Sequence, residues 1–247
     1  MAVRKSAANP GNSAGVTERP LVTVDVAIFT VRDDSLQVLL VHRPSVAGEP
    51  YPGRPALPGG FVDIRRDTTL HDCALRKLKE KTGLAAPYLE QLGSWGGAKR
   101  DPRGWSATHA WFALVPPPAD DEVDPAPAEA EWVDAEAALS RRLAFDHNEI
   151  LAAALARLRA KVEYTSLPAF LLAEPFTLPQ LQRIYEVVLG RELDKSAFRK
   201  RMLDADFLRE TGAVSGASGR AAQGYRIADR SAPVYFPRPF KSGEQLA

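Results

Sequence analysis

The sequence has little of what would assign it to several classes of protein. It holds one cysteine, Cys73, in 247 residues, so an intrachain disulfide is excluded and we expect a reducing compartment such as the cytoplasm. It has no apolar run near the roughly 20 residues that a membrane helix needs, and its first twenty residues lack the apolar centre of a secretion signal. The net charge of +1 favours no class of partner by itself. These absences predict a soluble chain with no membrane role.

The charge is unevenly distributed along the chain. From Thr177 to the end there are twelve Lys and Arg against eight Asp and Glu, a net charge of +4, and the preceding residues carry −3. A chain of this length is long enough for two modest domains. The sequence predicts a disordered tail over residues 1–20, a first domain over 21–164 and a second domain over 165–247.

The first domain reads as strands and helices joined by one loop rich in Pro and Gly. Two β-rich runs before residue 44 predict a hairpin, and residues 44–60 predict a loop that can approach a ligand closely. Apolar residues four apart predict a helix over 69–81, capped by Thr68 or Thr69 and ended by Gly83. The runs 89–96 and 107–116 predict a strand pair around a polar loop at 97–105. An exposed acidic excursion over 116–131 and a helix over 144–164, with Ile150, Ala154, Leu158 and Val162 on one face, complete the prediction.

The second domain begins with a strong helix signal. Thr177 is followed three residues later by Gln180, a capping-box arrangement, and Gly190 is suited to end the helix. A second helix is predicted from Asp194 as its N-cap, with Phe198, Met202 and Leu203 as buried positions and Gly212 as the end of the segment that follows. The glycine-rich residues 212–224 precede the strand-like stretches "YRIAD" and "PVYF". This order is typical of a helix-turn-helix followed by a β-wing.

The stretch "LPGGFVDIRRDTTLHDCALRKLKEKTGL" resembles the signature of the Nudix hydrolase family through its "LPGG", Arg76, Leu78, Glu80 and "TGL". The resemblance implies a mixed β-sheet between helices. The family's four acidic positions fall here on Thr68, Lys77, Glu80 and Lys81, so one carboxylate of four remains. Counting forward from Gly60 places the first of them on Arg66, which is not a Glu either.

The loss of three of the four carboxylates affects metal binding. A Nudix helix gathers carboxylates on one face because Mg²⁺ or Mn²⁺ prefers oxygen ligands and bridges a diphosphate. Lys77 and Lys81 place positive charge on that face, and the nearest other carboxylates are Asp63 and Asp67. We therefore expect no metal, no cofactor and no catalytic residue among the box positions Thr68, Arg76, Lys77, Glu80 and Lys81.

The same lysines are compatible with holding a diphosphate directly. Arginines on loops around the expected pocket could add forked contacts to phosphate oxygens, although each alone is about as well explained as a solvated charge. Trp95 and Trp105 could stack on a base, but packing is the more common role of single aromatic side chains. The predicted ligand-binding residues are Arg43, Arg54, Lys77, Lys81, Arg100, Asp101 and Arg103.

A basic cluster on the second helix of the C-terminal domain predicts contacts to a DNA backbone. The alternative is a solvated basic face with no partner. The capped helix before this second helix and the wing after it favour DNA binding. The predicted DNA-binding residues are Lys195, Ser196, Arg199, Lys200, Arg201, Arg220 and Arg226, with Arg230 also on the wing.

Taken together, the two halves resemble the Nudix-related transcriptional regulators of NAD metabolism. The stretches "LPGGFV", "RDPRG", "LAFDH", "FTLPQLQRIYEVVLG" and "LDKSAFRKRML" carry this resemblance. It implies a homodimeric repressor of NAD synthesis or salvage genes, whose Nudix domain binds ADP-ribose and whose helix from Asp194 to Leu203 reads an operator. Some relatives instead control sugar use, and Ala197 stands where the family often has Asn. The alternatives are a metal-dependent ADP-ribose or nucleoside-diphosphate pyrophosphatase and a nucleotide-binding scaffold for another protein.

Overall fold

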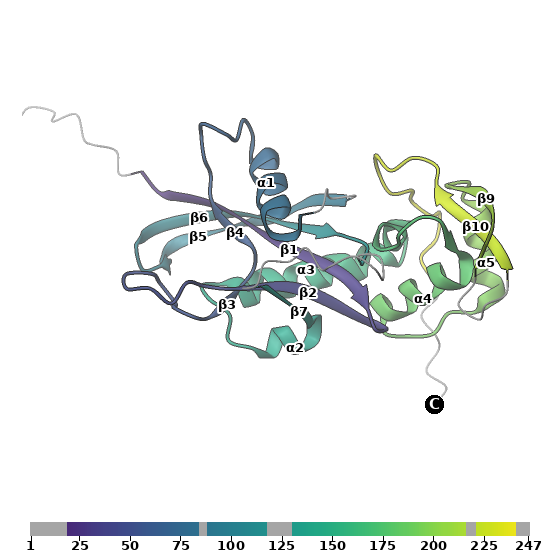
Figure 1. Ribbon diagram of the computed structural model, residues 1–247, viewed down its shortest axis with the longest axis horizontal. Helices are drawn as coiled ribbons and strands as arrows, with labels where there is room; N and C mark the ends of the chain where they lie inside the picture. Colours follow the sequence, from purple (N-terminus) through teal and green to yellow (C-terminus); the bar gives the residue numbers. More distant parts are fainter. Residues whose placement is uncertain (1–18, 84–87, 118–129, 216–220, 241–247) are drawn as a thin grey trace, which may run out of the picture.

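The computed structural model describes residues 19–83, 88–117, 130–215 and 221–240, and shows two units end to end (Figure 1). The N-terminal unit is a large sheet covered by helices, and the smaller C-terminal unit lies against one end of that sheet. Residues 1–18 of the tail predicted to be disordered, and most of the acidic excursion, lie outside the described residues. Across the part of the chain that is described, no helix is long and apolar enough to cross a membrane.

The large sheet is mixed, and β1 is at its centre. In the described residues its strand order is β3-β2-β1-β6-β5, with β4 added on β1 and β7 on β2. β1 runs parallel to β6, and the other pairs are antiparallel. The strands are β1 Leu21–Arg32, β2 Ser35–His42, β3 Pro55–Ala56, β4 Gly59–Phe61, β5 Tyr88–Asp101, β6 Gly104–Leu114 and β7 Ala130–Asp134.

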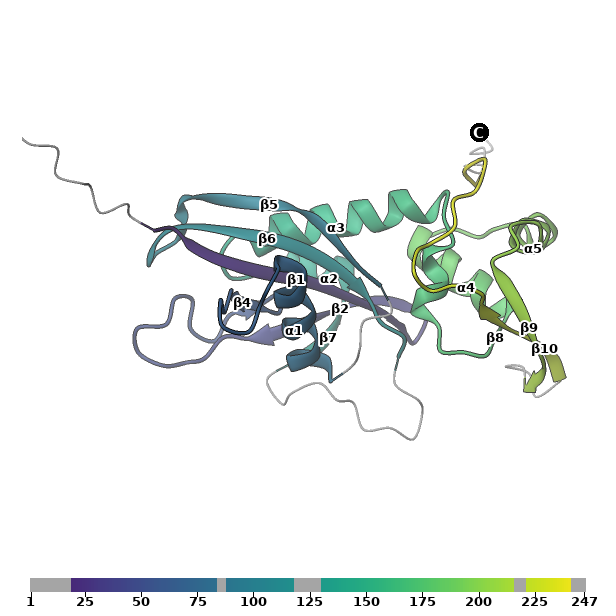
Figure 2. The same ribbon diagram turned by 90° about the horizontal axis from the view of Figure 1, so that it is seen from above.

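Helices cover both faces of this sheet. α1 (Leu70–Thr82) lies on one face, and α2 (Ala135–Ser140) and α3 (His147–Val162) lie on the other (Figures 1 and 2). β1 is buried on both faces: Val24, Val26 and Ile28 belong to the α1-side core, and Ala27 and Phe29 to the α3-side core. The alternation follows from the two-residue period of a strand. The mixed sheet between helices that the sequence predicted is confirmed.

The helix ends follow the predicted local chemistry. Thr69, and not Thr68, caps α1 by accepting a hydrogen bond from the backbone N–H of Asp72, whose carboxylate accepts from the N–H of Thr69. Gly83 ends the helix in the left-handed conformation. The predicted stripe on α3, at Ile150, Ala154, Leu158 and Val162, is buried.

The C-terminal unit is a small helical domain with a three-stranded sheet, in the order β8-β10-β9. Thr177 and Gln180 form the expected capping box on α4, Gly190 ends it, and Asp194 caps α5. The β9–β10 hairpin forms the wing (Figure 1). The elements are η1 Leu167–Leu171, β8 Phe176–Thr177, α4 Leu178–Leu189, α5 Lys195–Asp204, β9 Leu208–Ser215 and β10 Ala221–Ile227.

The structure corrects several details of the sequence prediction. Leu203, expected to be buried, is 42% exposed, because the inward face of α5 is filled by Phe198 and Met202. Gly212 does not end the segment that follows α5 but lies inside β9. The loop expected over 97–105 is largely strand, because β5 and β6 continue to a tight turn after Asp101. "PVYF" forms only an isolated bridge between Thr165 and Tyr235.

The two units share one apolar core. The α3-side core continues from the sheet through η1 and α4 to Phe198 on α5. Polar contacts reinforce the junction: Arg183 on α4 donates to Asp34 in the β1–β2 turn at 2.8 Å, and Arg191 donates to both oxygens of Glu163 at 3.0 Å. The C-terminal unit is therefore packed against the sheet, beside the turn that follows β1.

Candidate functional site

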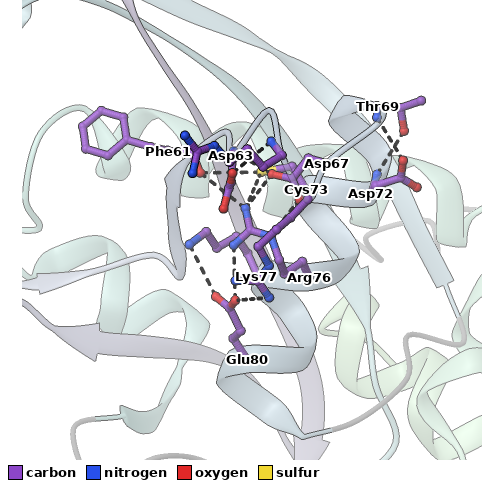
Figure 3. A network of polar contacts seen from close by, with 11 residues as sticks. Phe61, Asp63, Asp67, Thr69, Asp72, Cys73, Arg76, Lys77 and Glu80 are labelled. Atoms are coloured by element: carbon purple, nitrogen blue, oxygen red, sulfur yellow. Dashed lines mark hydrogen bonds and ion pairs between the residues drawn. The ribbon is translucent and has the colours of Figure 1, made fainter.

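The helix α1 carries the motif positions, and Arg76 is fixed by a buried carboxylate (Figure 3). Arg76 donates from Nε to Asp67 Oδ1 at 2.7 Å and from Nη2 to Asp67 Oδ2 at 2.6 Å. The Asp67 side chain is 1% exposed and also accepts the backbone N–H of Asp63. The hydrogen bonds from Arg76 lower the pKa of Asp67 despite its burial. Beside this pair, burial raises the pKa of the Cys73 thiol to about 11, so the thiol stays protonated and unreactive.

Glu80, the remaining box carboxylate, is surrounded by cations. Its oxygens lie 3.2 Å from Arg76 and 3.4 Å from Lys77 (Figure 3). Arg66 lies 3.5 Å away. Burial opposes its ionisation, but the hydrogen bond from Arg76 and the charge of Lys77 outweigh this and lower its pKa. No group of three or more His, Cys, Asp or Glu side chains within the described ranges is placed to hold a metal ion. These residues do not fit the divalent metal of a Nudix hydrolase, since the box carboxylate Glu80 and the neighbouring Asp67 are both paired with cations and no cluster of free carboxylates in the described part of the chain faces them.

A cavity of about 770 Å³ opens next to this helix, near the N-terminal end of β1. Its volume lies within the range of small-molecule sites. Segments far apart in the sequence meet there: β1, the loop after β2, β4, the end of α1, the β5–β6 turn and the start of α3. Its charged and aromatic lining comprises Asp25, His42, Arg43, Glu49, Phe61, Lys81, Arg100, Asp101, Arg103, Phe145 and His147.

The floor of the cavity is a buried ion network centred on Arg100. The Arg100 side chain is 5% exposed and donates to Asp25 at 2.8 Å and to Asp146 at 2.9 Å. His147 accepts the backbone N–H of Leu57 through Nδ1, so its ring proton is on Nε2, 3.5 Å from Asp25. Burial opposes ionisation of Asp25, but His147 and Arg100 outweigh it and lower the pKa of its carboxyl. The network joins β1, β5 and the first turn of α3.

The two glycines of "LPGG" are favoured for different reasons, Gly59 by close approach and Gly60 by its positive φ. A Cβ on Gly59 would lie 2.1 Å from Asp25 Oδ1 and 2.6 Å from the carbonyl oxygen of Val24. Gly60 has φ +148°, and a Cβ there would lie 2.9 Å from Lys77 Nζ. The motif therefore allows the backbone of β4 to pack on the buried carboxylate and on α1.

The arginines on the rim are also fixed in place. Arg103 holds Asp101 with two parallel hydrogen bonds of 3.0 and 2.8 Å, and its guanidinium lies 5.0 Å from the centre of the Phe61 ring. Arg43 donates to Glu49 at 2.5 Å and lies 4.8 Å from the centre of the Phe145 ring. Arg103 keeps about a third of its side chain exposed, so it can still meet an anion.

The structure brings five of the seven predicted ligand-binding residues to the cavity: Arg43, Lys81, Arg100, Asp101 and Arg103. Arg54 and Lys77 are not in its lining. Arg54 stacks on Tyr51, with 5.2 Å from guanidinium to ring centre, and Lys77 lies against Gly60 and Glu80. Sequence reasoning missed Asp25 and His147. The available signal for Asp25 was one charged residue inside an otherwise apolar strand.

The exposed face of α5 carries most of the predicted nucleic-acid contacts. Lys195, Ser196, Arg199 and Lys200 are exposed, while Phe198 and Met202 face the core. Lys200 pairs with Asp204 one turn later at 2.7 Å. On the wing, Arg226 is exposed and pairs in register with Arg209 across the hairpin. Arg209 is paired with Asp206 at 2.8 Å, so Arg226 is the cation of this pair that stays available to a polyanion.

Two predicted basic residues differ from this pattern, and a third cannot be compared with it. Arg201 turns back toward the C-terminal segment: its guanidinium lies 4.0 Å from the centre of the Phe240 ring and donates to the Pro239 carbonyl. It therefore packs against the C-terminal segment and is half-buried, whereas Arg199 is exposed. Arg230 is held by Glu174 at 3.1 Å. Arg220 lies outside the described residues.

Comparison with known proteins matches both halves of the chain. Residues 21–154 match the NUDIX domain family, and residues 168–227 match the NrtR DNA-binding winged helix domain. A protein of Acinetobacter baylyi named ADPR responsive transcriptional repressor NtrR is 48% identical over 219 residues, which cover 89% of this chain and 86% of that protein. The ADP-ribose pyrophosphatase of Methanocaldococcus jannaschii is 33% identical over 128 residues, 51% of this chain and 70% of that enzyme.

Solved structures agree with this assignment. Shewanella oneidensis NrtR superimposes with a TM-score of 0.81 at 39% identity, covering 89% of this chain and 100% of that one. Its complex with a 27mer DNA gives 0.79 at 37% identity, covering 89% and 99%. Its NUDIX domain with ADP ribose gives 0.51 at 37% identity, covering 60% and 94%. The chain belongs to the family of Nudix-domain proteins that carry the NrtR winged helix domain.

Proposed function

We propose that this chain is a transcriptional repressor that binds operator DNA through α5 and the β9–β10 wing and binds ADP-ribose, or a related NAD-derived nucleotide, in the cavity beside β1. One observation carries the proposal: a pocket lined by fixed guanidinium groups lies beside a box whose remaining carboxylate, Glu80, is held by cations. The names of its relatives support it, since one is an ADPR responsive repressor and NrtR has been solved with DNA and with ADP ribose.

The ligand's diphosphate is held by protein cations in place of a metal. Lys81 lines the cavity from the end of α1 and Arg103 from the β5–β6 turn, and each can donate to phosphate oxygens. Arg100 contributes its positive charge from the floor of the cavity, because its N–H groups already donate to Asp25 and Asp146. Arg43 completes the rim. With Glu80 and Asp67 paired with cations and no cluster of three metal-ligating side chains among the described residues, the bound diphosphate lacks the Mg²⁺ activation that hydrolysis requires.

The signal travels along the sheet. Asp25 lies at the cavity end of β1, and the strand ends about 23 Å away at Arg32, at a rise of about 3.3 Å per residue. The turn beyond it contacts Arg183 of α4. In the family's manner, the repressor acts as a homodimer in the cytoplasm, with the effector unit over 21–164 and the DNA-binding unit over 165–247. A ligand that moves two winged units relative to each other weakens their joint fit to successive major grooves, at a typical coupling of about 1–3 kcal/mol.

The test is a DNA-binding titration with the full chain. Labelled fragments from the gene's own upstream region and from NAD synthesis and salvage promoters are titrated with protein, with and without ADP-ribose, NAD or a pentose. We expect sequence-specific, salt-dependent binding that ADP-ribose weakens and the pentose leaves unchanged. The repressor proposal fails if no fragment binds more tightly than random DNA.

A second function, hydrolysis of ADP-ribose, is favoured by one observation: the similarity to an archaeal ADP-ribose pyrophosphatase over half of this chain. Incubation of ADP-ribose with the protein and Mg²⁺ or Mn²⁺, followed by chromatography for AMP, separates the two functions. We expect no turnover above the level of a Glu80→Gln variant. Turnover that Glu80→Gln abolishes would assign the chain as an enzyme.

A further inference from the structure

A second cavity, of about 610 Å³, lies next to the first at the β5–β6 turn. Its lining comes from the start of β1 and from the turn itself: Arg19, Pro20, Leu21, Arg103, Gly104 and Trp105. Arg103 lines both cavities. A ligand whose anionic part meets Arg103 can therefore extend into either space.

Trp105 gives this cavity its chemical character. It is 52% exposed, although it is among the largest apolar side chains of the protein. On the neighbouring strand it lies over Gly96, where an added Cβ would be 3.4 Å from Trp105 Cη2. Trp95, by contrast, packs against the α3-side core, and Trp111 is 7% exposed. Trp105 thus offers a flat aromatic surface to the cavity.

The group between the two cavities is rigid. Asp101 is 2% exposed and fixes the Arg103 guanidinium with two hydrogen bonds, and Phe61 supports it on one side. An anion held there is at a fixed position relative to Trp105, two residues along the chain. Exposed Arg19 lines the same space from the start of β1. Aromatic rings and guanidinium planes are the groups on which nucleobases stack.

We propose that Trp105 and Arg19 form a stacking subsite for the base of a nucleoside diphosphate whose phosphates are held by Arg103. This inference rests on the proposed nucleotide effector and deepens it: the base is recognised outside the main cavity, at the β5–β6 turn. Stacking is tolerant of base identity, so the subsite selects nucleotides over sugar phosphates without selecting adenine strictly.

The experiment measures binding of ADP-ribose and of base-free ribose 5-phosphate to the full chain by calorimetry. Trp105→Ala is expected to weaken ADP-ribose by about tenfold and to leave ribose 5-phosphate unchanged. Trp105→Phe retains a ring and is expected to keep most of the ADP-ribose affinity. Trp95→Phe is the matched control, with no effect on either ligand. Quenching of tryptophan fluorescence by ADP-ribose should persist in Trp95→Phe and be lost in Trp105→Phe, although the latter still binds.

The outcomes separate this inference from the proposal on which it rests. If wild-type protein binds neither probe, both fail. If ADP-ribose binds wild type and Trp105→Ala equally, or if both probes are weakened in parallel, the base subsite is overturned and the nucleotide effector stands. Unchanged ADP-ribose affinity with a smaller sedimentation coefficient in Trp105→Ala would assign this face to a contact between copies of the chain, which also overturns the subsite.

Discussion

The cations around the cavity and those on α5 are chemically the same, but their surroundings differ. Near the cavity, Arg76, Arg100 and Arg103 are each clamped by a nearly fully buried carboxylate. On α5, Lys195 and Arg199 are exposed, and neither forms an ion pair with another of the described residues. Paired, desolvated charges define a shape, whereas solvated ones create a field that attracts a polyanion. In the proposed function, the clamped cations would thus recognise a small anion by position and the solvated ones a polyanion by charge.

The largest effect should come from breaking a clamped arginine. Arg100→Met leaves Asp25 and Asp146 buried without their partner, so the free energy of unfolding should fall by about 3–5 kcal/mol in urea denaturation. Arg157→Met is the matched control: Arg157 is 42% exposed and its partner Glu90 keeps Lys161, so a loss below about 1 kcal/mol is expected. Equal losses in the two variants would contradict the distinction between clamped and solvated cations.

The next effect depends on pH. The pKa of Asp67 is lowered in the folded state, so its pairing with Arg76 contributes stability that is present above the ordinary pKa near 3.9 and is lost as pH falls through the folded value. Asp67→Asn should cost about 2–3 kcal/mol at pH 7, and less at pH 3. Urea denaturation of both proteins at pH 7, 5, 4 and 3 measures the difference. A difference that stays constant with pH would exclude the ionised carboxylate as its source.

Arg201 lies on the same helix as Lys195 and Arg199, but its guanidinium contacts the protein. Arg201→Ala removes the contact with Phe240 and the hydrogen bond to Pro239, and should lower the free energy of unfolding by about 1–2 kcal/mol. The salt dependence of DNA binding should not change, because this guanidinium faces the protein. A reduced salt slope in this variant would place Arg201 on the DNA after all.

The smallest effect on stability is expected from the exposed cations. Lys195→Ala and Arg199→Ala should change the free energy of unfolding by less than about 0.5 kcal/mol. Each should nevertheless reduce the slope of log affinity against log salt concentration by about one if it contacts a phosphate. Fluorescence anisotropy at several salt concentrations gives the slope. Stability losses like that of Arg201→Ala would show that these residues are structural.

Local features of the fold were predictable because they depend on neighbouring residues. The caps at Thr177 and Asp194 and the helix end at Gly83 need only the residues within one turn. The apolar stripe of α3 follows from helical periodicity alone. The extension of β5 and β6 to the tight turn was not predictable in this way, since Pro102 and Gly104 favour a loop and the pairing of the two strands overrides them.

The candidate site was only partly predictable because its contacts are long-range. Arg100 was expected on a loop, free to bind phosphate, whereas it is buried between carboxylates 75 and 46 residues away in the sequence. The inward direction of Arg201 likewise depends on Phe240, which packs against α5 from the C-terminal segment. Residue type indicated positive charge in both cases, and tertiary packing decided whether that charge was available.

The apolar core that continues from the sheet to α4 limits where the chain can be divided or recombined with a relative. The two family matches end at Ala154 and begin at Pro168, but the core between them includes Leu158, Val162 and Leu167. A cut anywhere in this interval would expose apolar surface on both pieces. The two units therefore share one apolar core and are not expected to fold when separated. An exchange of binding specificity between relatives should succeed with substitutions at the pocket rim or on the exposed face of α5, where side chains can change without disturbing that core.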